Sequence, residues 1–308
     1  MLRRGTPVCY TPSIPRESKL AGRLCRGGLW LLFIPLGVAL AAGPGRLEKT
    51  FDTTDTPQVI LSNLRGQVVV RGWGKPQVHA LCTTASPRVE VDTEVLPSAG
   101  AAERVRLATH VMDPLVAGNE ETTDCTLEVP QAASIEIKNR QGAVRIENLQ
   151  GQHALADSAD AAIWVKDVAG HLVARSLGGD IYIERASGRV EAVSITGAVR
   201  IIAPTSKNLR ANTNTGQITY EGDFLPTGEY ILSTYSGDIE LLCPASASFE
   251  LDAKTVKGKL LNSFTLRPKR HTAVPFPGAQ GLLGTYNTGN ATVELRSFSG
   301  TIRVRQQP

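Results

Sequence analysis

Four side chains suited to binding recur at near-equal spacing in the middle of the chain. Each lies three positions after the central residue of a repeated turn motif, and they are Arg145, Trp164, Tyr182 and Arg200. Aromatic rings and guanidinium groups together form stacking and cation–π contacts with sugars or peptides. The interpretation we favour is a ladder of side chains that covers and stiffens a sheet, and the alternative is a binding face that uses these contacts.

The carboxylates that could serve acid–base catalysis are not clustered. Asp180 and Asp238 each follow a motif glycine, but the repeats between them carry Ala198 and Gln217 at that position. Polysaccharide lyases and hydrolases need carboxylates, or a base beside a cation, in one groove. The sequence also contains no convincing Ser-His-Asp order or phosphate-binding glycine loop. It therefore predicts a protein that is not an enzyme, with a carbohydrate-active β-helix enzyme as the alternative.

Two histidines occupy equivalent positions one repeat apart. His153 and His171 would stack on neighbouring coils, with Arg189 next in line. Imidazole is a common metal ligand, but no third ligand aligns with this pair. We therefore expect surface histidines, with no metal ion or other cofactor.

The cysteines leave one question open. Cys82, Cys125 and Cys243 remain once the N-terminal segment, which holds the other two cysteines, is set aside. An exported protein can keep disulfides, so Cys82 and Cys125 are candidates for one. The alternative is three small buried hydrophobic residues.

A repeat positions all of these residues. It has Ser, Thr or Asn three residues before a glycine, and aliphatic residues two and four after it, at intervals of 18 to 21 residues between positions 142 and 258. The central residues of the motif are Gly66, Gly142, Ala161, Gly179, Gly197, Gly216, Gly237, Gly258 and Gly300. A half-repeat lies between successive motifs, so one period holds two short strands and two tight turns.

Alternate side chains of a strand face opposite ways, so the two aliphatic positions share one face. One coil cannot bury that face alone, but stacked coils build a continuous core. The sequence therefore predicts an all-β fold, a β-solenoid or β-helix-like stack of two-strand coils. We expect the glycine to supply a positive φ, and the hydroxyl to bond the turn or the neighbouring coil.

The segments around the regular repeats give the domain organisation. Residues 43–130 read as an N-terminal β region with the first coil and loop excursions. Residues 131–308 form the solenoid region, with an irregular insert at 264–288 near the C-terminal coil. The last strand ends in polar residues and Pro308, which would blunt an open edge of the stack.

The first 42 residues have the features of a signal peptide. Arg23 and Arg26 precede an apolar run over 29–42, and Ala39 and Ala41 form an A-x-A cleavage pattern. The run is shorter than the about 20 residues of a membrane span. We expect export to the periplasm or cell surface after cleavage, with no stable span remaining. An uncleaved anchor is the alternative.

The repeated A-x-S-x-x-G-x-V-x-I motif, the entry segment "LEVPQAASIEIKNRQGAV" and the closing "GTYNTGNATVELRSFSGTIRV" resemble an exported bacterial "putative adhesin" β-repeat family of unknown function. The resemblance covers roughly residues 50–305 and implies an extracytoplasmic β-repeat protein. This chain departs from the family pattern at Ala161, where a glycine is expected.

The main functional hypothesis is an adhesin-like scaffold or binding surface in the cell envelope, whose partner is an envelope glycan or protein. A partner in envelope-stress signalling is a further alternative. The net charge of +4 and the lack of a basic tract argue against nucleic acid.

Overall fold

The computed structural model describes residues 45–97, 100–112, 121–269 and 280–307, which all belong to one compact unit, 42–308. Its regular elements are all strands. Within this described part, no helix has the length and apolar character needed to cross a membrane. The predicted signal peptide, 1–42, lies outside the described residues, as does the segment 270–279 of the predicted insert.

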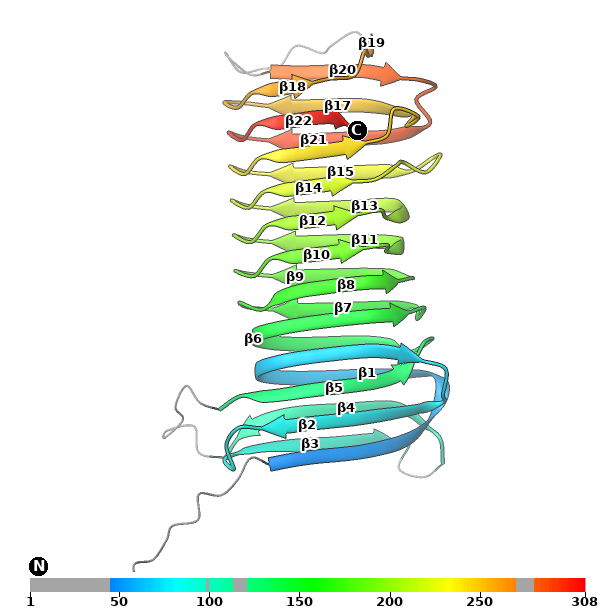
Figure 1. The fold of residues 1–308 in the computed structure, drawn as a ribbon, viewed down its shortest axis with the longest axis vertical. Helices are drawn as coiled ribbons and strands as arrows, with labels where there is room; N and C mark the ends of the chain where they lie inside the picture. The colour runs from blue at the N-terminus through cyan, green and yellow to red at the C-terminus, as the bar shows by residue number, and fades with distance from the viewer. Residues whose placement is uncertain (1–44, 98–99, 113–120, 270–279, 308) are drawn as a thin grey trace, which may run out of the picture. The chain divides into compact units, whose positions relative to one another are not determined.

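Each regular coil contributes two strands, one to each of two facing parallel sheets (Figure 1). The strands of one sheet are β7 (His153–Ser158), β9 (His171–Ser176), β11 (Ser187–Ser194), β13 (Thr205–Thr213) and β15 (Glu229–Thr234). Those of the other are β8 (Ala162–Val168), β10 (Ile181–Glu184), β12 (Val199–Ile202), β14 (Ile218–Glu221) and β16 (Ile239–Cys243). The inward aliphatic side chains of both sheets form one buried core. This confirms the all-β, β-solenoid-like stack.

The motif hydroxyl joins coils as well as closing its own turn. Ser194 Oγ accepts a hydrogen bond from Gly197 N at 3.0 Å and donates to the carbonyl oxygen of Gly179, one coil back, at 3.4 Å. Thr213 repeats both bonds with Gly216 N and the carbonyl oxygen of Gly197. Both roles expected of this hydroxyl are confirmed, and they pair polar groups that would otherwise be buried unsatisfied.

The reason for the motif glycine differs from the expected one. Gly66 and Gly142 do have a positive φ, of 125° and 114°. From Gly179 onward the motif glycines are not in that region, so the expectation is wrong there. A Cβ on Gly197 would instead overlap the carbonyl oxygen of Gly179. Close approach of successive coils, not turn conformation, requires glycine at these positions.

The second turn of the coil carries a row of left-handed residues. Asn148, Asp167, Arg185 and Ala203 have φ values of 58°, 54°, 50° and 45°. Asn and Asp tolerate this region better than most residues, because their short polar side chains bond locally. The Asn148 side chain donates to the carbonyl oxygen of Gly72 in the neighbouring coil at 2.9 Å.

At the N-terminal end, spatial order departs from chain order. The strands are β1 (Gly45–Trp73), β2 (Gln77–Thr84), β3 (Val89–Leu96), β4 (Ala102–Val111), β5 (Thr123–Pro130) and β6 (Ser134–Leu149). Residues 58–71 of β1 pair with β6 on one side, and with β4 and β5 on the other. The coil formed by β4 and β5 therefore lies outside the coil formed by β1. Antiparallel strands β2 and β3 then pair with β5 and β4.

The C-terminal end is interleaved in the same way. Its strands are β17 (Phe249–Thr255), β18 (Leu260–Asn262), β19 (Arg267–Pro268), β20 (Gln280–Tyr286), β21 (Ala291–Ser297) and β22 (Ile302–Gln306). The last coil, β21 and β22, lies between the β15–β16 coil and the β17–β18 coil (Figure 1). The last strand does not form an open edge, so that expectation is wrong.

Described parts of 264–288 form β19 and β20, and β20 pairs antiparallel with β17.

Candidate functional site

Four parallel strands bring the predicted row together. Arg145 on β6 lies opposite Trp164 on β8, Trp164 opposite Tyr182 on β10, and Tyr182 opposite Arg200 on β12. The row points outward because its neighbours two and four after each motif residue are core residues, such as the fully buried Ile163. Both arginines are exposed and both aromatic residues are half-buried.

The aromatic rings stack on each other along the row. The ring planes of Trp164 and Tyr182 differ by 6°, with centroids 5.7 Å apart. The guanidinium carbon of Arg145 lies 5.8 Å from the centroid of the Trp164 ring. The ring faces are therefore turned toward neighbouring coils, and their edges are turned outward. A ligand would meet ring edges and flanking charges rather than a flat aromatic platform.

A hollow of about 320 Å³ runs beside this row. Its other wall is the outward row two residues further along each strand. The lining side chains of the two rows are Arg145, Trp164, Tyr182 and Arg200, and Glu147, Lys166, Glu184 and Ile202. The volume is at the lower end of the roughly 300–1,000 Å³ typical of small-molecule sites. The hollow crosses four coils and combines apolar ring edges with charges of both signs.

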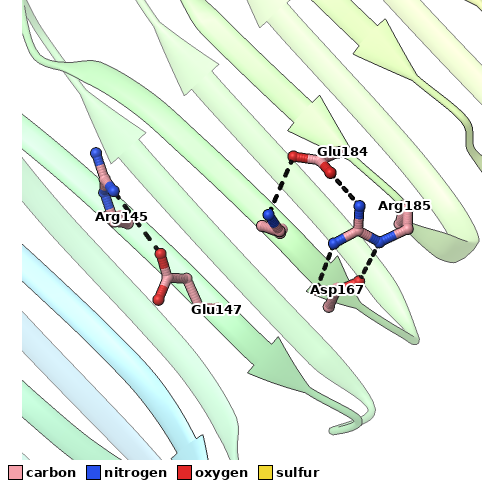
Figure 2. Close-up of polar contacts among 6 residues, drawn as sticks. Arg145, Glu147, Asp167, Glu184 and Arg185 are labelled. Carbon is pink, nitrogen blue, oxygen red and sulfur yellow. Dashed lines mark hydrogen bonds and ion pairs between the residues drawn. The ribbon is translucent and has the colours of Figure 1, made fainter.

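Ion pairs organise the second row (Figure 2). Arg145 and Glu147 approach to 3.8 Å, and Lys166 and Glu184 to 3.5 Å. Arg185 binds both carboxylate oxygens of Asp167, at 2.6 and 2.8 Å, and also pairs with Glu184 (Figure 2).

This network differs in part from a simple ladder of alternating charge. Glu147 pairs with Arg145 and with Arg71, at 3.2 Å, while Lys166 turns to Glu184. The hydrogen bond from Arg185 lowers the pKa of Asp167 below its usual range. Sequence reasoning missed the Asp167–Arg185 pair because both residues lie in the second turn.

The two carboxylates weighed for catalysis are bound to backbone. Asp180 Oδ1 accepts a hydrogen bond from Ala198 N at 2.7 Å, and Asp238 Oδ1 accepts one from Thr301 N at 2.7 Å. Arg303 also donates to Asp238, at 2.7 Å. Burial would raise the pKa of Asp238, but these hydrogen bonds outweigh it and the pKa lies below its usual range. A general acid needs the opposite shift.

The two histidines lie side by side as the register requires. His153 is opposite His171, with ring centroids 5.3 Å apart and an edge-on geometry. His171 Nε2 lies 3.4 Å from a carboxylate oxygen of Glu191. Among the residues that the structure describes, no three His, Cys, Asp or Glu side chains converge to hold a metal ion.

Cys82 and Cys125 form a disulfide. They lie directly opposite each other on antiparallel β2 and β5, so the bond fastens an end strand to the outermost N-terminal coil. Cys243 is a buried free thiol, and burial raises its pKa to about 12. A thiol in that environment is not nucleophilic at neutral pH.

The sequence reasoning missed exposed apolar side chains along the motif turns, in a row that is interrupted by Asn214. Leu177, Ile195 and Tyr235 each lie two residues before a motif glycine and are 55%, 46% and 56% exposed. The ring of Phe298 stacks on that of Tyr235, with centroids 4.8 Å apart. The motif position was visible in the sequence, but the Tyr235–Phe298 contact depends on the interleaved last coil.

Comparisons with known proteins place the chain in a family. No curated protein matches it. A solved structure described as a putative cell adhesion protein from Clostridium sporogenes is 11% identical, covering 86% of this chain and 100% of that one, with a TM-score of 0.27. One described as a putative adhesin from Bacteroides fragilis is 11% identical, covering 85% and 97%, with a TM-score of 0.40. Residues 115–305, more than half of the chain, match the family described as Toastrack DUF4097, and the chain belongs to that family.

Proposed function

We propose that the protein is a non-catalytic binding scaffold of the bacterial cell envelope. The observation that carries this proposal is the hollow beside the row Arg145, Trp164, Tyr182 and Arg200, which joins four coils into one surface. The catalytic alternative has less support, because the carboxylates of Asp180 and Asp238 each accept a hydrogen bond from a backbone N–H of the next coil.

The chemistry of the hollow suits an envelope glycan or an extended protein segment. Ring edges of Trp164 and Tyr182 give apolar contact, while Lys166 and Glu184 offer a donor and an acceptor on the facing wall. Such a mixture of apolar and polar groups is typical of sites that orient a ligand.

The compartment is part of the proposal. The signal-peptide pattern over residues 1–42 and the Cys82–Cys125 disulfide both favour an oxidising, extracytoplasmic location. Intact-mass spectrometry of the protein recovered from the envelope fraction should give a mature N-terminus at Gly43 or a neighbour. Recovery of the full-length chain in the membrane would instead favour the uncleaved anchor.

Binding on a glycan array and to envelope proteins tests the surface. The variant Trp164→Ala with Tyr182→Ala should lower affinity for any ligand found by about tenfold or more, because it removes the aromatic side of the hollow. Tyr235→Ala is the matched control, since Tyr235 is an exposed aromatic residue outside the hollow. Equal losses in both variants, or none in the first, would contradict this assignment.

The proposal that the protein is non-catalytic has a separate test. Incubation with a panel of polysaccharides should yield no new reducing ends or unsaturated products. Turnover that disappears in Asp180→Asn or Asp238→Asn would overturn the non-catalytic proposal in favour of a carbohydrate-active enzyme.

A further inference from the structure

A second hollow lies on the other sheet, over β11, β13 and β15. It has a volume of about 170 Å³. Its charged and polar lining residues are Arg189, Glu191, Asn208, Arg210 and Glu229. The lining strands are regular coils in the middle of the stack, so the positions of these residues are set by strand register.

Two arginines and two glutamates line this hollow, and within the described residues they form no ion pair with one another. Elsewhere, opposite charges two residues apart on an outward face form ion pairs, as in Lys138–Glu136 at 2.7 Å and Arg296–Glu294 at 2.9 Å. Arg189 has the same spacing to Glu191, but Glu191 turns to His171 instead.

The charged residues of the hollow also form no ion pairs with the described residues directly opposite them across the strands. Arg210 lies directly opposite Glu191, and Glu229 directly opposite Asn208. Within the described residues, neither arginine of the hollow has an ion-pair partner, and neither does Glu229. Two guanidinium groups and one carboxylate therefore surround the hollow with their hydrogen-bonding capacity unused.

The positions of the two arginines suit one shared anion. Arg189 lies opposite Asn208, and Arg210 is two residues further along that strand, so the arginines are diagonal neighbours. Diagonal neighbours are about 7–8 Å apart at their Cα atoms, within reach of long side chains. Guanidinium groups only donate hydrogen bonds and bind carboxylates in a bidentate way. Glu229 only accepts, so it suits a hydroxyl beside that carboxylate.

We propose that this hollow binds a carboxylate-bearing sugar unit of an acidic polysaccharide. Arg189 and Arg210 hold the carboxylate, and Asn208 and Glu229 accept hydrogen bonds from neighbouring hydroxyls. The hollow is smaller than the roughly 300–1,000 Å³ sites that bury whole small molecules. One sugar unit enters it while the polymer continues over the sheet. This site is independent of the surface proposed on the opposite sheet.

Calorimetric titration of the exported protein with polygalacturonate oligomers, at low and moderate salt, tests this site. Arg189→Gln and Arg210→Gln should each weaken binding by roughly tenfold or more, since each removes a charge-assisted bond to the carboxylate. Arg175→Gln is the matched control, because Arg175 is an exposed arginine of the same sheet outside the hollow. Its affinity should equal that of the wild type.

Several outcomes would overturn the proposal. Equal weakening by Arg175→Gln would show a diffuse attraction between charges, and no saturable binding would show no site. A neutral dextran that binds as tightly would exclude carboxylate recognition, and polyglutamate that binds as tightly would exclude recognition of a sugar. Trp164→Ala with Tyr182→Ala should leave polygalacturonate binding intact, so failure of the other proposed surface would not affect this result.

Discussion

At the scale of single residues, the motif glycines from Gly179 onward are conformationally ordinary but sterically required. Each successive coil passes so close to the one before that a Cβ on Gly197, Gly216 or Gly237 would overlap a carbonyl oxygen. Strands in register lie only about 4.8 Å apart, which leaves no room for a methyl group directed along the stack. These three glycines are therefore intolerant of substitution even though their backbone angles would suit other residues.

Gly197→Ala should lower the free energy of unfolding by about 1–3 kcal/mol, the usual cost of overpacking. Gly74→Ala is the control, because a Cβ there would meet nothing within 4 Å. Urea unfolding followed by circular dichroism measures both. Similar stabilities of the two variants would contradict the steric explanation.

The carboxyl group of Asp238 gives a prediction about pH. Its pKa is lowered in the folded state, so its contribution is complete above the ordinary Asp pKa of about 3.9 and is lost as the pH falls through the folded-state pKa. Asp238→Asn should cost about 1 kcal/mol at pH 7, since the Arg303 pair is partly exposed and screened.

The pH series provides the internal control for that variant. Unfolding curves of wild type and Asp238→Asn should converge as the pH falls through the acidic range, because wild-type Asp238 becomes uncharged there. A difference that stays constant down to the most acidic folded condition would mean that the charge of Asp238 contributes nothing.

At the scale of elements, the last coil acts as an insert rather than a terminus. Ser297 Oγ donates to the carbonyl oxygen of Gly237, and Thr255 Oγ1 donates to that of Gly300. The motif hydrogen bonds therefore run through β21 and β22, which are the parallel neighbours of β17 and β18. Outside these strand pairings, the ring of Phe249 on β17 also contacts that of Phe224, with centroids 5.2 Å apart. The C-terminal segment thus links two parts of the stack that adjoin in sequence but not in space.

Deletion of residues 291–308 should remove hydrogen-exchange protection from β15–β18 as well as from the deleted strands. The reason is that the β17–β18 coil then has no parallel neighbour and stands two coil spacings from β15 and β16. Retained protection in β17 and β18 would show that the gap closes. Leu295→Ala, which leaves the coil in place, should cost about 2–5 kcal/mol because Leu295 is fully buried.

At the scale of the whole described unit, the strands at the two ends of the stack determine how much of each sheet edge is left unpaired. At the N-terminal end antiparallel β2 and β3 cover β5 and β4, and the Cys82–Cys125 disulfide fixes β2 to β5. At the C-terminal end antiparallel β20 covers β17. An open edge of a sheet can pair with another chain, so this covering also limits aggregation. A compartment that reduced the disulfide would loosen this end first.

Reduction of the disulfide should lower the free energy of unfolding by about 2–4 kcal/mol, because it releases a constraint on the unfolded chain. The double variant Cys82→Ser with Cys125→Ser should be insensitive to dithiothreitol, whereas Cys243→Ala should keep the full response. Thermal unfolding with and without dithiothreitol measures all three proteins. A response of the double variant equal to that of wild type would contradict the assignment.

The sequence by itself determined the coil, its register and the outward row. Alternation along a strand and the spacing of the motif are local properties, so the spacing alone places Arg145, Trp164, Tyr182 and Arg200 on neighbouring strands. The same spacing located the core positions and the motif hydroxyls.

Tertiary structure alone decided the order of the end coils, the stacking of the Trp164 and Tyr182 rings and the open charges around Arg189 and Arg210. Motif spacing says that two coils pair, but not which free edge a distant coil joins, because that depends on which edges the folded chain leaves unpaired. Side-chain partners follow in the same way, since Glu191 can turn to His171 or to either arginine, and only its surroundings select one.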